Sequence, residues 1–248
     1  MKVNWHERYL QQSSWTENIR DYLLKDIPFT ETTLLLETGS GSGVILSDLA
    51  CKKPGQFVGI DINFDRCAVS TRNYRNIAVS NADAYALPYP STAFDLVICH
   101  YFLLWLTDPN LVLQEIFRVL KSGGFFVAFA EPDYSSRIDL PCPLDSLGKL
   151  QTKALDGQGV NTITGKELAT RIAHNGFRPL KFGVAAYEHP IPGIPEWWES
   201  EWQVMEHDLL PYLSAEEIAA YKNLDRDSWL SGTRVLWVPT AYALGQKP

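Results

Sequence analysis

The stretch LLLETGSGSG, residues 34–43, decides the fold. An apolar run is followed at once by a glycine at every second position, at Gly39, Gly41 and Gly43. Glycine lets the backbone turn sharply and lets a ligand approach it closely, because no Cβ stands in the way. The next segment, VILSDLACKK at 44–53, has the apolar spacing of a helix. The sequence therefore predicts a buried strand, a glycine turn and a helix whose N-terminus faces a ligand.

The alternation of strand and helix patterns continues along the chain. Four more apolar segments predict strands, and they are FVGIDI at 57–62, AVSNAD at 78–83, AFDLVICHY at 93–101 and FFVAFAE at 125–131. Amphipathic patterns at 64–76 and 110–120 predict helices between them. Two further strands are expected, PLKFGVAAYE at 179–188 and RVLWVPTAYALG at 234–245. Such alternation predicts an α/β fold with a parallel sheet and helices on both faces.

The remaining segments are expected to cover this sheet rather than to form a second domain. Ser14 to Glu17 matches a capping box and predicts a helix that begins there, within an N-terminal helical cover at 1–30. Two stretches that lack the alternation, 132–163 and 187–232, are interpreted as insertions after the fifth and sixth strands. We expect both insertions to cover the substrate, within one domain spanning 1–248.

The composition excludes several classes of protein. The chain has 248 residues, a net charge of −7 and a pI of about 5.3, and an acidic chain without a basic run is not typical of a nucleic-acid binder. Its four cysteines are widely spaced, which favours reduced thiols and a cytoplasmic location. The longest apolar stretch, YFLLWL, is too short to span a membrane. No two histidines have the spacing of metal ligands, so we predict no metal.

The glycine turn does not match the dinucleotide-binding fingerprint G-x-G-x-x-G. Counted from Gly39 the third glycine would fall at Val44, and counted from Gly41 it would fall at Leu46. The strand instead closes with Glu37, whose carboxylate would repel a pyrophosphate but would suit an ammonium or sulfonium group. The turn alone therefore favours a cationic ligand over a nicotinamide dinucleotide.

Two carboxylates after later strands indicate a nucleoside. Asp61 closes the second strand, where a carboxylate can accept hydrogen bonds from both hydroxyls of a ribose. Asp83 ends the third strand and could accept a hydrogen bond from an adenine amino group. Ile62 and Ala84 could lie on the two sides of the base.

Four segments occur in order and at intervals that resemble a known family. LLLETGSGSG, VGIDI, SNADAYALPYPSTAFDLVICHYFLLWL and RVLKSGG resemble the class I S-adenosylmethionine-dependent methyltransferases. The likeness is to the small-molecule branch that includes the ubiquinone/menaquinone C-methyltransferases, and it covers 33–131 closely and 164–184 and 233–248 loosely. It implies a Rossmann-like, doubly wound sheet of seven mostly parallel strands with an antiparallel last strand. It also implies S-adenosyl-L-methionine as cofactor, S-adenosyl-L-homocysteine as product and a small-molecule acceptor.

The resemblance also implies a set of cofactor-binding residues. Glu37 replaces the more usual Asp, which keeps the negative charge. The full set is Glu37, Gly39, Ser40, Gly41, Gly43, Asp61, Ile62, Asn63, Asp83, Ala84, Cys99 and His100.

The choice of a catalytic residue is less constrained. Methyl transfer from a sulfonium is an in-line displacement, so a general base helps only when the nucleophile starts protonated. His100, Tyr101 and Glu131 are the candidates at the predicted carboxyl edge of the sheet, and His100 could equally be a hydrogen-bonded pocket residue. Candidate substrate contacts are Trp15, Tyr134, Trp198 and Trp202.

The stretch IPEWWESEWQVMEHD, residues 194–208, allows two interpretations. Aromatic faces beside carboxylates would suit a cationic or amine substrate. Alternatively, Trp198, Trp202 and Met205 form the core stripe of a helix whose acidic face lies in solvent, and this second interpretation is favoured.

Two other functions stay open at this point. The chain could bind S-adenosylmethionine as a regulatory subunit without catalysis. A nicotinamide-dependent oxidoreductase is less well supported, because both glycine frames fail and the chain contains no Tyr-x-x-x-Lys pair. The sequence leaves the substrate, the acceptor atom and the oligomeric state undetermined.

Overall fold

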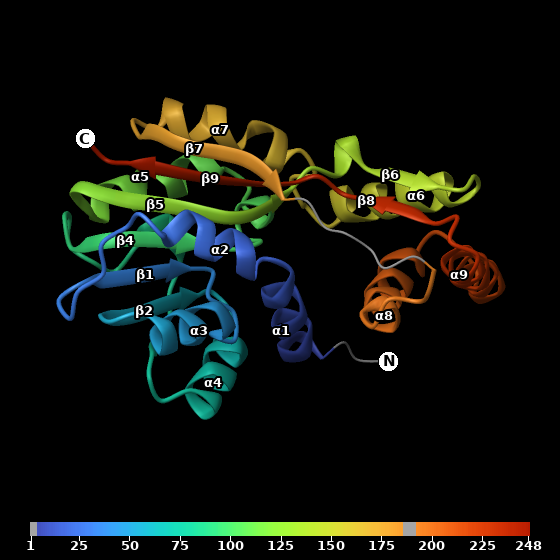
Figure 1. Ribbon diagram of the computed structural model, residues 1–248, viewed down its shortest axis with the longest axis horizontal. Helices are drawn as coiled ribbons and strands as arrows, with labels where there is room; N and C mark the ends of the chain where they lie inside the picture. Colours follow the sequence, from blue (N-terminus) through green and yellow to red (C-terminus); the bar gives the residue numbers. More distant parts are fainter. Residues whose placement is uncertain (1–3, 186–191) are drawn as a thin grey trace.

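The computed structural model describes residues 4–185 and 192–248 and contains a seven-stranded mixed sheet (Figure 1). Its strands stand in the order β3-β2-β1-β4-β5-β9-β7. Their bounds are β1 Leu34–Thr38, β2 Gln56–Asp61, β3 Ala78–Asn81, β4 Phe94–Cys99, β5 Leu120–Pro132, β7 Arg178–Ala185 and β9 Thr240–Gln246. Strands β1 to β5 are parallel, and β9 runs antiparallel to both of its neighbours. This arrangement confirms the predicted fold and places the reversal of strand order between β1 and β4.

Helices cover both faces of the sheet because neighbouring strand residues point to opposite sides. Leu35 packs with α2 (Glu17–Leu24) and α3 (Val44–Lys52), whereas Leu36 belongs to the core on the other face. That second face is covered by α5 (Pro109–Val119) and α7 (Thr164–His174). Helix α4 (Phe64–Asn73) packs beside β2 and β3. Because both faces of the central strands are buried, their sequences are mostly apolar without alternation, as in β1 and β4.

The N-terminal cover is two helices rather than one. Helix α1 spans Trp5–Trp15, and Thr16 joins it to α2. Asn4 caps α1 by accepting a hydrogen bond from the Glu7 N–H at 3.4 Å. The predicted capping box at Ser14 is wrong, because the Ser14 hydroxyl donates back to the Gln11 carbonyl within α1.

The two insertions pack against each other and form a unit, called the cover below, with its own hydrophobic core. The cover contains α6 (Leu144–Gly157), α8 (Trp198–Leu209) and α9 (Ala215–Leu230), together with the strand pair β6 (Ile138–Leu140) and β8 (Val235–Trp237). The predicted strand at 234–245 is therefore two strands, since β8 pairs with β6 and only β9 joins the large sheet. Residues 186–191, which include parts of the predicted strand at 179–188 and insertion at 187–232, lie outside the described residues.

Buried ion pairs join the two insertions. Arg234 donates to Asp139 at 2.7 Å and to Asp225 at 2.5 Å, and Asp139 also pairs with Arg137. Asp225 additionally accepts both indole N–H groups of α8, at 2.5 and 2.8 Å. The two arginines balance the two aspartates, so no net charge is buried within this network.

Remaining short elements are three 3₁₀ turns, η1 (Ala84–Ala86), η2 (Leu103–Trp105) and η3 (Tyr134–Ser136). Within the ranges that the structure describes, no helix has the length and hydropathy needed to cross a membrane.

A glycine fixes how closely α7 approaches the end of β5. A Cβ added to Gly165 would lie 2.4 Å from the Glu131 carbonyl oxygen, and backbone atoms cannot move aside cheaply. We expect Gly165→Ala to lower the free energy of unfolding by about 1–3 kcal/mol, although alanine has the higher helix propensity. Chemical denaturation measures the change. The exposed neighbour Lys166→Ala should stay within about 0.5 kcal/mol, and equal stability of both variants would contradict the packing argument.

Candidate cofactor and substrate site

A single cavity of about 1140 Å³ runs from the glycine turn into the cover. One end is lined by the carboxyl ends of the central strands and the other by residues of α6, α8 and β8, with residues of α1 along both. The carboxyl edge at a reversal of strand order is where open α/β sheets bind ligands. The volume and the partly apolar lining are those of a pocket for small organic ligands.

The glycine turn must lack side chains at two positions that face this cavity. Gly39 and Gly41 have φ of +68° and +53°, in the left-handed region. A Cβ on Gly39 would lie 2.1 Å from the Phe102 ring, and one on Gly41 would lie 3.0 Å from the Tyr9 ring. Gly43 serves packing instead, since a Cβ there would lie 2.3 Å from the Ser70 hydroxyl of α4.

Asp61 is held in place by backbone donors. Its Oδ2 accepts the Gly41 N–H and its Oδ1 accepts the Asn63 N–H, both at 2.8 Å. The side chain is almost buried yet lines the cavity. Each carboxylate oxygen keeps a further acceptor site, so Asp61 presents a fixed pair of acceptors to a ligand's hydroxyl groups.

Glu37 provides a test of whether a cationic ligand fits. It lines the cavity at the end of β1, and its Oε2 is buried with no hydrogen-bond partner. Burial raises the pKa of Glu37 well above its usual range, against the opposing effect of Arg20. A bound cation would favour the ionised carboxylate that burial disfavours. The environment of Glu37 therefore suits the ammonium or sulfonium group expected there.

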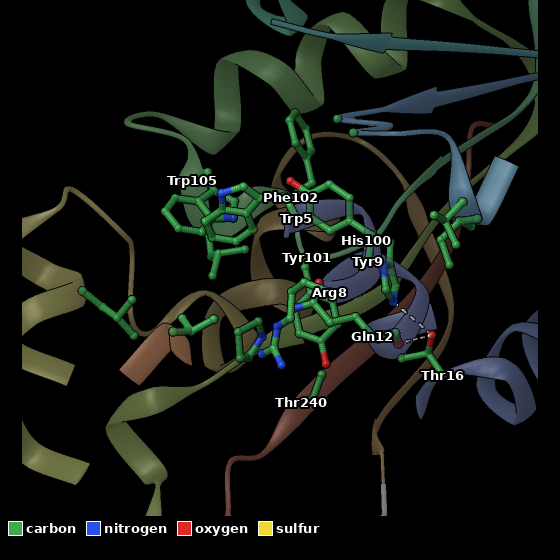
Figure 2. Close-up of a pocket in the computed structure, with 18 of the residues that line it drawn as sticks. Trp5, Arg8, Tyr9, Gln12, Thr16, His100, Tyr101, Phe102, Trp105 and Thr240 are labelled. Atoms are coloured by element: carbon green, nitrogen blue, oxygen red, sulfur yellow. Dashed lines mark hydrogen bonds between the residues drawn. The ribbon is translucent and has the colours of Figure 1, made fainter. Parts of the chain in front are cut away.

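His100 lies at the end of β4 beneath α1. Its Nε2 is 2.9 Å from the Thr16 hydroxyl (Figure 2). Arg20 donates to that same hydroxyl at 2.8 Å. Burial, with a contribution from Arg20, lowers the pKa of His100 to about 3. The imidazole is therefore uncharged at neutral pH and is a weak proton acceptor.

Helix α1 connects the glycine turn to the cover (Figure 1). At one end the His6 ring lies 2.8 Å from the Ser42 hydroxyl. Along the same helix, Arg8 forms an ion pair with Glu201 of α8. Burial would lower the pKa of Arg8, but the paired carboxylate outweighs it and the net shift is upward. Helix α1 thus forms a wall of the cavity and contacts both the glycine turn and the cover.

Two tyrosines line the cavity beside this ion pair. Tyr101 has a positive φ of +48° and lies close to Arg8 and Thr240 in Figure 2. Tyr134 comes from η3. Burial is the largest cause that raises the pKa of both hydroxyls. Both hydroxyls therefore stay protonated at neutral pH and can donate hydrogen bonds.

Most of the predicted site residues line the cavity, and six do not. Those that line the cavity are Trp15, Glu37, Gly39, Ser40, Gly41, Asp61, Ile62, Asp83, Ala84, His100, Tyr101 and Tyr134. Those that do not line it are Gly43, Asn63, Cys99, Glu131, Trp198 and Trp202.

Glu131 is the clearest departure from expectation. Its carboxylate is fully buried and accepts the N–H groups of Phe102, Leu103 and Leu104 at 3.0–3.2 Å. The Cys99 thiol donates to the same carboxylate at 3.7 Å. Glu131 therefore orders η2, and the geometry does not support its expected catalytic role. Asn63 likewise caps α4 by accepting the Arg66 N–H.

The tryptophan-rich stretch, residues 194–208, agrees in part with each of its two interpretations. Trp198 and Trp202 are buried in the core of the cover, as the favoured structural interpretation predicts. Trp197, Glu201 and Asp208 line the cavity instead.

Several cavity residues escaped the sequence analysis, and half of those named here belong to α1. They are Trp5, Arg8, Tyr9 and Gln12, with Phe102, Trp105, Gln158 and Thr240 from other segments. Asn4 followed three residues later by Glu7 is an N-terminal signal that would have extended the predicted helix to α1. No local pattern marks the other residues.

Comparisons with known proteins agree with this geometry. Residues 36–128 match the family model described as a methyltransferase domain. Over 130 residues the chain is 35% identical to a ubiquinone/menaquinone biosynthesis C-methyltransferase of Cellvibrio japonicus, covering 48% of this chain and 47% of the relative. The chain spans about two fifths of the length of other curated relatives, so likeness to whole proteins is partial.

Two solved structures share the fold at low identity. The geranyl diphosphate C-methyltransferase of Streptomyces coelicolor, in complex with S-adenosyl-L-homocysteine, gives a TM-score of 0.61 at 14% identity, covering 96% of this chain and 81% of that one. The cyclase SpnF gives a TM-score of 0.62 at 19% identity, covering 94% and 80%.

The sheet order, the glycine turn and the family match together define a domain of the class I, S-adenosylmethionine-binding methyltransferase fold. Within that class, the chain is a distant relative of the ubiquinone/menaquinone C-methyltransferases. Within residues 4–185 and 192–248, no group of three or more His, Cys, Asp or Glu side chains could hold a metal ion.

The buried carboxyl of Glu131 makes stability depend on pH. Burial is the largest cause that raises its pKa from 4.5 to about 7, against the opposing backbone hydrogen bonds. The folded state therefore holds this proton more tightly, so the contribution is complete below the unfolded value and is lost as pH rises through about 7. We expect the wild type to lose about 2–3 kcal/mol more than Glu131→Gln between pH 5 and pH 8. Denaturant titrations at both pH values check this, and parallel losses would contradict it.

Proposed function

We propose that the protein transfers a methyl group from S-adenosyl-L-methionine to a small-molecule acceptor. The observation that carries this proposal is the pair of carboxylates at the glycine turn. Asp61 is fixed by two backbone N–H groups, and Glu37 has a buried oxygen without a partner. One arrangement suits the ribose hydroxyls and the other suits a positively charged group.

The residues present would hold the cofactor as follows. Asp61 would accept the ribose hydroxyls, and Glu37 would face the cationic methionyl part. Gly39 and Gly41 would let that part approach the backbone, and Ile62 and Asp83, which also line the cavity, would contact the adenine. When bound, the cofactor supplies a methyl group on a good leaving group, so the protein need not activate it.

The contribution of the chain itself is binding and orientation rather than strong base catalysis. His100 has a pKa of about 3, and the hydroxyl of Tyr101 has a raised pKa. Glu131 lies outside the cavity. We therefore assign His100 and Tyr101 to the positioning of the acceptor, by hydrogen bonds. Correct alignment of the reacting atoms can account for roughly 7–11 kcal/mol of a barrier.

The position of the cover supports a small acceptor. Cavity residues of α6, α8 and β8 lie over the carboxyl edge of the sheet, together with α1 (Figure 1). These elements form walls of the cavity and therefore limit the size of the second ligand. The relative from Cellvibrio japonicus is named for a small-molecule biosynthesis, which supports the same class of acceptor.

The proposal is tested by incubating the protein with S-adenosyl-L-methionine and a panel of small acceptors. We expect acceptor-dependent formation of S-adenosyl-L-homocysteine, detected by mass spectrometry. Binding of the cofactor without any turnover would favour a regulatory role. Binding of a nicotinamide dinucleotide in its place would contradict the proposal.

Asp61→Ala should raise the dissociation constant of S-adenosyl-L-methionine at least tenfold, a loss of about 1.4 kcal/mol, because the ribose acceptor is removed. Calorimetric titration measures the change. Asp65→Ala is the matched control, since Asp65 is exposed on the first turn of α4 and does not line the cavity. Unchanged affinity in a folded Asp61→Ala protein would remove Asp61 from the cofactor site.

A further inference from the structure

Besides Glu37, one buried carboxylate that lines the cavity forms no ion pair with a Lys or Arg side chain among the described residues. Arg8 pairs with Glu201, Arg137 pairs with Asp139, and Arg66 lies 4.0 Å from Asp61. Asp208, in contrast, has no Lys or Arg partner among the described residues. It forms an ion-pair contact with His207, whose Nδ1 lies 3.6 Å from Oδ1 and whose side chain is 70% exposed.

Asp208 is buried in a way that costs stability. Only 5% of the residue is exposed, and Oδ1 accepts one hydrogen bond, from the Gln158 side-chain amide at 3.0 Å. Oδ2 is buried and has no hydrogen-bond partner. A buried carboxylate without full hydrogen bonding is unfavourable, because it has lost its water. A ligand in the cavity would supply the contact that Asp208 lacks within the protein.

The helix does not favour an acid at this position either. Asp208 lies in the last turn of α8, at the negative end of the helix dipole. Neither packing nor helix electrostatics therefore accounts for a carboxylate there.

The surroundings of Asp208 suit an organic cation. Trp197, Leu155 and Met205 line the same cavity and provide aromatic and apolar walls. Burial raises the pKa of the nearby Tyr134 hydroxyl, and Glu201 and Asp208 add to this shift while Arg137 and Arg8 oppose it. A cation beside a carboxylate and aromatic faces gains both charge pairing and cation–π attraction.

We propose that Asp208 binds a positively charged amino group of the acceptor, at the end of the cavity formed by the cover. The acceptor is thus an amine with an apolar or aromatic body, held by its ammonium group while another part reaches the glycine-turn end. The role as methyl acceptor rests on the proposed function, whereas the binding of an amine by Asp208 does not.

The test compares phenethylamine with the uncharged phenethyl alcohol as binding probes. Both are titrated into the full-length protein at neutral pH, with saturating S-adenosyl-L-homocysteine to occupy the end near Glu37. Binding of S-adenosyl-L-homocysteine is measured separately, so a failure of the proposed function is visible by itself. In that case the amine titration is carried out on a Glu37→Gln background.

We expect the wild type to bind the amine at least tenfold more tightly than the alcohol. Asp208→Asn should reduce this preference to less than threefold by weakening amine binding alone. Glu206→Gln is the matched control, because Glu206 lies on the same helix, pairs with Lys222 and does not line the cavity. An absent preference in the wild type, or one that persists in Asp208→Asn, overturns the proposal.

A second variant keeps the test independent of folding effects. Gln158 is exposed, and Gln158→Lys would place a cation beside Asp208. We expect this variant to lose the amine preference and to melt at or above the wild-type temperature, because the carboxylate is then paired internally. Retention of the preference in Gln158→Lys overturns the proposal as well.

Discussion

The hydrogen bond from the Gly41 N–H to Asp61 is the contact on which the site depends. It joins the turn after β1 to the end of β2, and its 2.8 Å length fixes the carboxylate that faces the cavity. The turn can approach Asp61 only because Gly39 and Gly41 adopt left-handed φ values. Their missing Cβ atoms also admit the rings of Phe102 and Tyr9, so the same two positions shape the floor of the cavity and its wall.

The sheet and the glycine-turn end could be predicted from the sequence because their signals are local. Some of the residues that form this end are only a few positions apart, as Glu37 and Gly39 are. Others are separated by one strand–helix unit, as Gly41 and Asp61 are. The direction of a side chain was harder to predict. Cys99 and His100 are neighbours, yet one packs in the core and the other faces the cavity. Both faces of β4 and β5 are buried, so their sequences do not alternate between polar and apolar residues. Without that alternation, the sequence does not tell which side chains face the core, and the buried position of Glu131 could not be predicted.

The end of the cavity formed by the cover could not be predicted, because its contacts join residues that are distant in sequence. Arg8 and Glu201 are 193 positions apart, and no local pattern links them. The α8 segment shows the same limit on a smaller scale. Trp197, Glu201 and Asp208 form one helical stripe, while Trp198 and Trp202 form the next. The periodicity defines both stripes, but only the fold decides which stripe faces the cavity. The likeness to the cyclase SpnF adds that this fold alone does not specify a reaction.

The hydrophobic core of the cover is separate from the two cores that flank the sheet. Trp202, Leu147 and Trp229 pack within the cover, whereas residues such as Leu46 and Val97 stabilise the sheet. Substitutions that reshape the cover therefore leave the architecture beneath it intact. During evolution, natural or directed, the cover can therefore change to accept a new ligand. The pocket at the glycine turn would stay the same.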